Sequence, residues 1–204
     1  MDDAGEPRPG QVAPEIAAEL PGLRLRWLVV RASAGASPPG LRARLRRLSD
    51  RGRGIDAVAM RTRPVPRAFR ACFRQLGLDP DVDRIPAERA VVDRLLHGGW
   101  RAGDAIADAC LLAVVETGVG VWALDAAAVD AERLSIQVGA AGGLVVADGS
   151  VVHAELFGDV PPGSAPDAGT RSVLLFAVGV DGVPEIHLHE ALWLAADALS
   201  PATP

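Results

Sequence analysis

The residues with the clearest chemical potential are the arginines of the segment 24–74. This segment contains 14 Arg and only two acidic residues, Asp50 and Asp56, and the whole chain contains no lysine. Guanidinium groups bind phosphate oxygens through paired N–H donors, so a clustered arginine surface predicts contact with nucleic-acid phosphates. Each contact acts within a Debye length of about 8 Å, so a protein that is acidic overall can still use a local basic face.

The same arginines also have an interpretation without a ligand. A helical pattern over 41–48 places Leu41, Leu45 and Leu48 on one face, and the arginines then cover the remaining, solvated surface. A bias in base composition would explain the absence of lysine, but it does not explain the clustering. Phosphate binding and simple solvation therefore both stay open.

Other chemistry-bearing patterns are weaker. His187, His189 and Glu190 are metal-ligand types, but positions i and i+2 diverge on a helix and no third ligand follows at a recognisable spacing. No Gly-x-Ser-x-Gly motif supports a serine hydrolase. The glycine-rich stretch 139–143 lacks the lysine of a P-loop and lies between expected strands. We therefore expect no metal and no cofactor.

A series of short motifs in the segment 67–125 carries the strongest functional signal. In order, they are Phe69-Arg70, Leu76-Gly77-Leu78-Asp79-Pro80, Arg84-x-Pro86-Ala87-Glu88, Arg94, Asp108, Glu116-Thr117-Gly118 and Ala123-Leu124-Asp125. Their order and spacing resemble the B3/B4 domain of the bacterial phenylalanyl-tRNA synthetase beta subunit, and more closely the free-standing proteins built from that domain. The resemblance covers residues 67–178, and the N-terminal third matches only loosely.

In the synthetase family this domain is the editing module, which hydrolyses wrongly charged tRNA. The resemblance implies that Asp159 and Thr170 are the catalytic candidates, which would position a water against the aminoacyl ester and stabilise the developing oxyanion. It implies a larger set of substrate-binding residues. These are Arg67, Arg70, Arg84, Glu88, Asp108, Trp122, Asp125 and Arg171.

Several pocket positions depart from the family pattern. The family's Thr-Asn pair is Cys110-Leu111, its Pro is Gly120 and its pocket His is Trp122. The Gly-Gly-Glu of its discriminating loop is matched at best by Phe157-Gly158-Asp159, and a Glu of the last strand is Phe176. These changes predict a less polar pocket with fewer groups to hold an attacking water. Binding is therefore a stronger expectation than hydrolysis.

The implied site residues have structural alternatives. Asp108 and Asp125 are expected to act as caps, or as buried carboxylates paired with Arg70 or Arg84, because a buried carboxylate normally needs such a partner. Glu88 lies at a helix start, where it would complement the helix dipole. The tryptophan that replaces the pocket histidine is more often a core residue than a stacking platform.

Composition bounds the class of protein. A chain of 204 residues with 49% hydrophobic residues can bury one sizeable core. A net charge of −5 and a pI near 5.4 exclude a general nucleic-acid coat protein. The charge is uneven: residues 1–101 contain 19 Arg and 12 acidic residues, whereas residues 102–204 contain 2 Arg and 14 acidic residues. Two isolated cysteines, no export signal and no bilayer-length apolar run predict a cytoplasmic protein.

These residues must be positioned by a mixed fold. We expect a flexible segment 1–14 and a single B3/B4-like domain over 15–200, of the α+β class, with a mostly antiparallel sheet packed against helices. The segment 55–60 fits either a strand or a helix end. Helices are expected at 41–48, 66–76, 86–97, 104–118 and 185–199. Strands are expected at 23–30, 119–124, 134–138, 144–146, 151–156 and 170–180.

Three functions are compatible with these patterns. The first is a tRNA or aminoacyl-tRNA binding protein, with hydrolysis of mischarged tRNA in trans left open. The second is a non-catalytic module that holds a free amino acid or another small aromatic metabolite in the more apolar pocket. The third is a protein-interaction role, in which the arginine face meets an acidic partner such as the C-terminal half of another copy. DNA and membranes are not expected partners.

Overall fold

The computed structural model describes residues 5–51, 62–100 and 102–200, so the ambiguous segment 55–60 lies outside the described residues. Within these ranges the chain forms six α-helices and two four-stranded sheets whose strand pairs are mostly antiparallel. The fold is therefore α+β, as the sequence predicts. None of the described helices is long and apolar enough to cross a bilayer.

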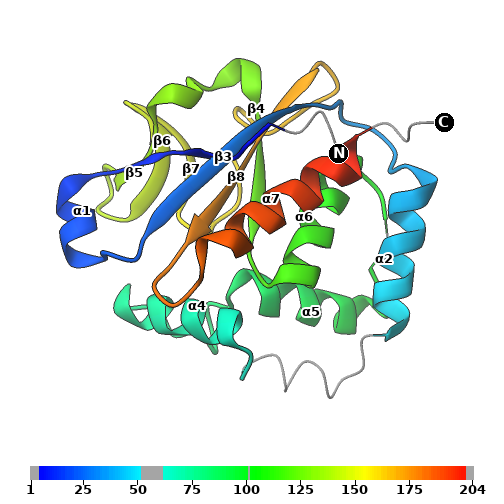
Figure 1. Cartoon of the computed structure of the whole chain (residues 1–204), viewed down its shortest axis with the longest axis horizontal. Coiled ribbons are helices and arrows are strands. Elements are labelled where there is room, and N and C mark those ends of the chain that lie inside the picture. The colour runs from blue at the N-terminus through cyan, green and yellow to red at the C-terminus, as the bar shows by residue number, and fades with distance from the viewer. Residues whose placement is uncertain (1–4, 52–61, 101, 201–204) are drawn as a thin grey trace.

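The first sheet lies at the centre of the molecule (Figure 1). Its strands, in spatial order, are β1 (Arg8–Pro9), β3 (Arg24–Arg31), β8 (Ser172–Gly179) and β4 (Val121–Asp125), and every neighbouring pair is antiparallel. All residues of β8 after Ser172 are buried. A continuous apolar run is typical of a strand covered on both faces, and β8 occupies such a position.

The second sheet is smaller. Its strands, in spatial order, are β2 (Gln11–Val12), β5 (Leu134–Val138), β6 (Leu144–Asp148) and β7 (Val151–Glu155). The last three form an antiparallel meander, while β2 pairs parallel to β5. Gly149 and Ser150 form the tight turn between β6 and β7, and Gly149 has a φ of 80°, which glycine adopts readily. Part of the segment 1–14, which we expected to be flexible, thus pairs with both sheets through β1 and β2.

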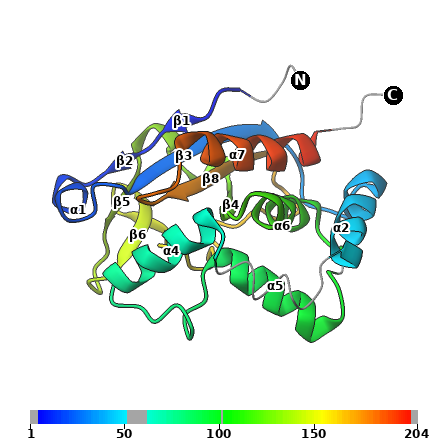
Figure 2. The same ribbon diagram turned by 60° about the horizontal axis from the view of Figure 1, so that its bottom comes forward.

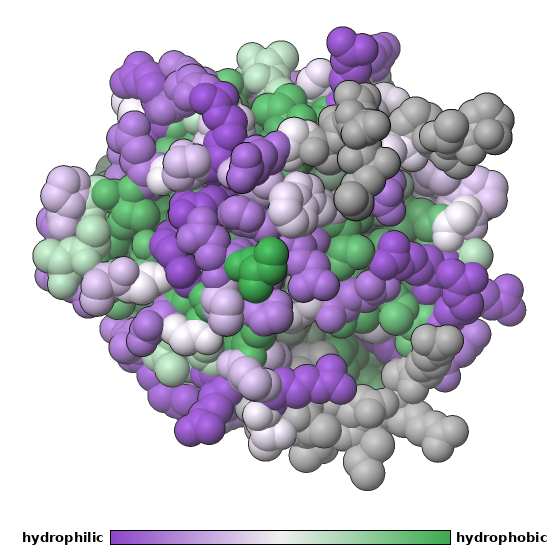
Figure 3. Space-filling model, in the orientation of Figure 1, coloured by the Kyte–Doolittle hydropathy of each residue, from purple (hydrophilic) through white to green (hydrophobic). Residues whose placement is uncertain are grey.

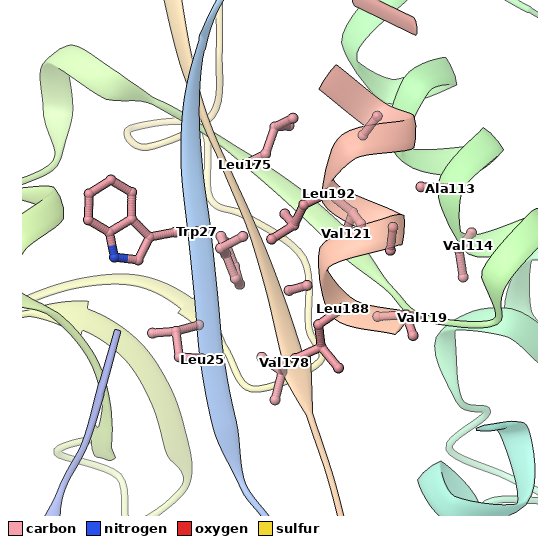
Figure 4. Close-up of a cluster of buried hydrophobic side chains, with 14 of the residues drawn as sticks. Leu25, Trp27, Ala113, Val114, Val119, Val121, Leu175, Val178, Leu188 and Leu192 are labelled. Carbon is pink, nitrogen blue, oxygen red and sulfur yellow. The ribbon is translucent and has the colours of Figure 1, made fainter. Parts of the chain in front are cut away.

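Two helices cover one face of the first sheet, α6 (Ala105–Thr117) and α7 (Glu185–Leu199). Leu188 and Leu192 of α7 are fully buried and point at the sheet from one side (Figure 4). Trp27 of β3 points away from α7, on the side of the second sheet (Figure 4). The first sheet is therefore the middle layer, between helices and the second sheet.

The remaining helices lie around the edge of this core. Two of them, α4 (Pro64–Gln75) and α5 (Pro86–His97), begin at a proline in the first helical position and lie below the sheet and α6 in Figure 2. The helix α5 is followed by Gly98, whose φ of 70° is the left-handed cap conformation that glycine adopts readily. The other elements are α1 (Pro14–Glu19), α2 (Pro39–Arg51) and the short 3-10 turns Ala126–Ala128 and Ala131–Arg133.

Ion pairs between the two halves of the sequence partly neutralise their uneven charge. The hydrogen bond from the Arg26 guanidinium is the main cause that lowers the pKa of the Glu185 carboxyl. Among the described residues, four ion pairs join the halves: Arg8 to Glu132, Arg26 to Glu185, Arg44 to Glu116 and Arg89 to Asp159. On the face shown in Figure 3, hydrophilic residues surround apolar residues that lie in small, separate groups.

Candidate functional site

A pocket of about 310 Å³ opens where α5, α6 and the start of β4 meet. This volume is at the lower end of the range for small-ligand sites, which is roughly 300–1,000 Å³. Most lining groups are apolar, and the charged ones come from α5 alone. The lining residues are Pro86, Arg89, Ala90 and Asp93 of α5, Cys110, Leu111 and Val114 of α6, Gly120, Val121 and Trp122 at β4, and Phe157 after β7.

Aromatic rings build one wall of this pocket. The Trp122 ring stacks on Phe176, with centroids 5.5 Å apart and an interplanar angle of 14°, and lies 6.2 Å from the Phe157 ring. Phe157 in turn contacts Phe69 and Phe73 of α4, at centroid distances of 5.9 Å and 5.2 Å. All four phenylalanines of the chain belong to this cluster. The wall is thus continuous with the core and resists deformation.

Phe157 has an unusual backbone conformation. Its φ is 63°, and it is the single non-glycine with a positive φ among the described residues. It occupies a tight turn in which the Gly158 amide donates to the Glu155 carbonyl at 2.9 Å. A left-handed conformation costs a non-glycine residue roughly 1–2 kcal/mol, and here the buried ring contacts offset this cost. The strained turn directs an aromatic ring into the pocket wall.

Gly120 permits the close approach of the tryptophan ring to the strand. A Cβ at this position would lie 2.7 Å from Cη2 of Trp122 and 3.1 Å from Cβ of Pro86. Any side chain at residue 120 would therefore push the ring or the start of α5 out of place. The position that the resemblance gives to a proline is filled here by the residue that leaves most room for Trp122.

The charged groups of the pocket lie at its mouth. Arg89 and Asp159 approach within 3.6 Å between Nη1 and Oδ1, with side chains 54% and 98% exposed, so this ion pair contributes little stability. Asp93 is 3.1 Å from Nδ1 of His97, and both are exposed. The mouth therefore presents one guanidinium and one carboxylate from neighbouring turns of α5.

Cys110 lines the pocket as a neutral thiol. Burial is the main cause that raises its pKa to about 12, and the nearby Asp104 carboxylate adds to the shift. Because the thiolate is the nucleophilic form, this thiol is not activated for covalent catalysis near neutral pH. It acts instead as part of the apolar wall.

Thr170, one of the two implied catalytic residues, lies away from the pocket. Its buried hydroxyl donates to Asp125 Oδ2 at 2.9 Å and accepts from the Asp167 amide at 2.9 Å. Asp125 pairs with Val173 in the sheet, whereas Trp122 pairs with Phe176, so the two groups occupy opposite ends of β4. Thr170 is not among the pocket-lining residues, and its contacts order the turn that leads into β8.

The other implied catalytic residue, Asp159, lies at the rim. Its carboxylate is almost fully exposed and its ion-pair partner is the pocket residue Arg89. Arg171, an implied binding residue, is exposed and donates to the carbonyls of Ala168 and Thr170, both at 3.0 Å. Arg171 thus belongs to the far end of β4, with Thr170.

Arg70 and Glu88 form a buried ion pair that joins α4 to α5. Nη1 of Arg70 donates to both Glu88 oxygens at 2.9 Å, and Nη2 donates to Asp81 at 2.8 Å. The hydrogen bond to Asp81 is the first cause that raises the pKa of Arg70. Glu88 therefore does more than complement a helix dipole. Arg84 is exposed and forms no ion pair within the described residues.

The carboxylates of Asp108 and Asp125 both have structural partners: Asp125 is a cap, one of the two roles that we expected, whereas neither carboxylate is paired with Arg70 or Arg84. Asp108 is buried and accepts hydrogen bonds from the Ser37 hydroxyl and from the Gly103 amide. Asp125 accepts from the Ala127 amide at 2.9 Å as well as from Thr170. Neutral hydroxyl and amide donors satisfy these carboxylates in place of Arg70 or Arg84.

Sequence reasoning missed one cluster entirely. Asp148, His153 and Ser164 have the residue types of a serine-hydrolase triad: His153 Nδ1 is 2.9 Å from Ser164 Oγ, and Nε2 is 3.1 Å from Asp148 Oδ1, although not aligned for a hydrogen bond. Ser164 is only 5% exposed and none of the three lines the pocket. The cluster therefore ties β6 and β7 to the loop 157–169. Its members come from separate segments, so no motif could reveal it.

No family model matches the chain, and no curated protein matches it either.

Proposed function

We propose that this protein binds the aminoacyl end of an aminoacyl-tRNA, with the amino-acid side chain in the pocket between α5, α6 and β4. One observation carries the proposal. Positions that the resemblance assigns to the editing pocket come from three separate elements, namely α6, the start of β4 and the turn after β7, yet they line the same cavity. They are Cys110, Leu111, Gly120, Trp122 and Phe157.

The chemistry of the walls favours an apolar or aromatic amino acid. The Trp122 and Phe157 rings offer stacking and edge contacts, and Leu111 adds an aliphatic surface. At the mouth, Asp93 would accept the α-ammonium group of the ligand, and Arg89 would contact a phosphate of the tRNA 3′ end. In this arrangement the walls of the pocket contact the amino-acid side chain, and its mouth contacts the charged groups of the ligand.

Binding is supported better than side-chain catalysis. Thr170 is engaged with Asp125 at the far end of β4, and the Cys110 thiol stays protonated near neutral pH. Asp159 lies at the mouth and is almost fully exposed to solvent. Any hydrolysis of the ester would therefore depend on backbone amides or on the terminal hydroxyl of the tRNA itself.

A second candidate function is the binding of a free amino acid. The observation in its favour is the presence of one guanidinium and one carboxylate among the lining residues, Arg89 and Asp93, which suits the carboxylate and ammonium of a zwitterion. An aminoacyl ester has no free carboxylate, so only this second function needs Arg89 as a carboxylate ligand. The two candidates thus differ in the role of one residue.

The test compares charged tRNA, uncharged tRNA and free amino acids as ligands. We expect tRNA charged with phenylalanine or tyrosine to bind at least tenfold more tightly than uncharged tRNA, and Trp122→Ala to abolish that difference. Trp193→Ala is the matched control, because Trp193 lies on α7 and is 38% exposed. Binding of free phenylalanine without any tRNA binding would select the second function. Equal affinity for charged and uncharged tRNA would contradict the proposal.

A further inference from the structure

A stripe of arginines runs along one side of α4, on which Arg63, Arg67 and Arg74 are exposed and Arg70 is buried. Arg63 is the residue before the helix, and Arg67, Arg70 and Arg74 follow at intervals of four, three and four residues. This spacing places all four on one helical face. The opposite face carries Phe69 and other buried residues that pack into the aromatic cluster. The helix is therefore sharply divided into a cationic side and a core side.

The stripe borders a second hollow of the surface, of about 290 Å³. Its described lining consists of Thr62, Arg67, Arg70 and Arg74, so three guanidinium groups converge on one concave site. Arg70 is paired with Glu88 and Asp81, whereas Arg67 and Arg74 add two positive charges beside it, which an anion in the hollow would balance.

The three arginines are held differently. Arg70 is fixed by its hydrogen bonds to Glu88 and Asp81, which neutralise its charge and set the position of its guanidinium. Arg67 and Arg74 are exposed and form no ion pair with any described residue. The hollow therefore has one rigid arginine at its base and two exposed cations beside it. This is a preorganised site that retains excess positive charge.

We propose that this hollow is a phosphate-binding site. Arginine forks match phosphate oxygens in pairs, and Arg67 and Arg74 lie about 10 Å apart along the helix axis at 1.5 Å per residue. Because arginine side chains are long, Arg67 and Arg74 can contact successive phosphates of an RNA backbone or converge on one polyphosphate in the hollow that they both line. The ligand is either an RNA backbone, in which case the inference rests on the proposed function, or a free polyphosphate.

The experiment measures binding of two probes, inorganic pyrophosphate and uncharged tRNA, to the full chain. The variant is the double substitution Arg67→Gln with Arg74→Gln, which leaves the Arg70 ion pairs intact. The matched control is Arg46→Gln with Arg47→Gln, which removes the same charge from exposed positions of α2. Thermal melts of both variants verify that the fold is kept.

We expect the α4 variant to weaken binding at least tenfold and to reduce the salt slope of tRNA binding by about two, while the α2 control stays within twofold. Loss of both probes identifies an RNA backbone site. Binding of pyrophosphate alone identifies a free polyphosphate site, and it would leave the proposed tRNA function without support. Equal losses in the two variants, or no binding of either probe, would overturn the inference. Trp122→Ala separates the two proposals, because it should leave pyrophosphate binding unchanged.

Discussion

The two ends of β4 contrast in chemistry although only a few residues separate them. At its start, Gly120 and Trp122 line an apolar pocket with an aromatic wall. At its end, Asp125 accepts hydrogen bonds from Thr170 and from a backbone amide, in a partly exposed polar turn. A strand advances about 3.3 Å per residue, so the two ends are roughly 10 Å apart.

Under the proposed function, the pocket end of β4 serves ligand binding and the polar end serves the stability of the fold. The residues that the resemblance makes catalytic or binding are not gathered in one place: Trp122 is at the pocket, whereas Thr170 and Arg171 belong to the polar turn. If the division is correct, changes at one end should alter ligand binding and changes at the other should alter stability alone. The following predictions test it.

The largest effect is expected from Phe157, at the pocket end. Phe157→Ala should lower the free energy of unfolding by about 3–5 kcal/mol, because it removes a buried ring that contacts three other aromatic side chains. Phe157→Gly should be no less stable than Phe157→Ala, since glycine adopts a φ of 63° without strain. Chemical denaturation measures both. A glycine variant clearly less stable than the alanine variant would show that the turn is not strained.

A substitution at the polar end of β4 should lower the stability of the protein without changing its affinity for the ligand. Thr170→Val keeps the side-chain shape and removes the hydroxyl that donates to Asp125, so the free energy of unfolding should fall by about 2 kcal/mol. Affinity for charged tRNA, and any rate of deacylation, should stay within twofold of the parent protein. Thr170→Ser is the control that keeps the hydroxyl. A large fall in turnover at unchanged stability would place Thr170 in the catalytic machinery after all.

A methyl group added at position 120 should weaken ligand binding. Gly120→Ala places a methyl group against the Trp122 ring and Pro86, so we expect affinity for the charged ligand to fall about tenfold, or 1.4 kcal/mol. Gly163→Ala offers a control in the loop 157–169, because a Cβ there meets nothing within 4 Å. Isothermal titration would detect the difference. Unchanged affinity would mean that Trp122 does not define the pocket.

The smallest effect is expected from Cys110. Its pKa of about 12 keeps the thiol protonated between pH 6 and pH 9, and the thiolate fraction rises only as the pH approaches the pKa. Cys110→Ala should therefore leave any deacylation rate and its pH profile in this range unchanged. A rate that depends on Cys110 near neutral pH would contradict the assignment of this residue to the passive wall.

Much of the helical structure could be predicted because its signals are local. The helix α5 begins with a proline and is followed by Gly98, and the side chain of Asp104 caps the start of α6. The division of the strands into two sheets was not predictable, since the alternation of apolar residues does not say which strands pair. The pairing of Gln11–Val12 with β5 depends on a two-residue strand, which leaves no pattern in the sequence.

The site could also be predicted in part, and the prediction failed where residues from distant segments meet. The order of the motifs suggested which residues belong to the pocket, but not that Thr170 lies at the other end of a strand from Trp122. The arginine spacing on α4 is visible in the sequence, whereas the carboxylates that fix Arg70 come from outside that helix. The contact of His153 with Ser164 joins two segments that no local signal connects.

The pairing of β3 with β8 has a consequence for how the chain is made. The strand at 24–31 finds its partner only at 172–179, and β8 is also the neighbour of β4. On a ribosome, most of the polypeptide must therefore emerge before the central sheet can close. Until then the arginine-rich N-terminal half lacks its later ion-pair partners Glu116, Glu132 and Glu185. Such non-local closure predicts slow folding, with the apolar side chains of β3 and β4 exposed on the nascent chain until β8 has emerged.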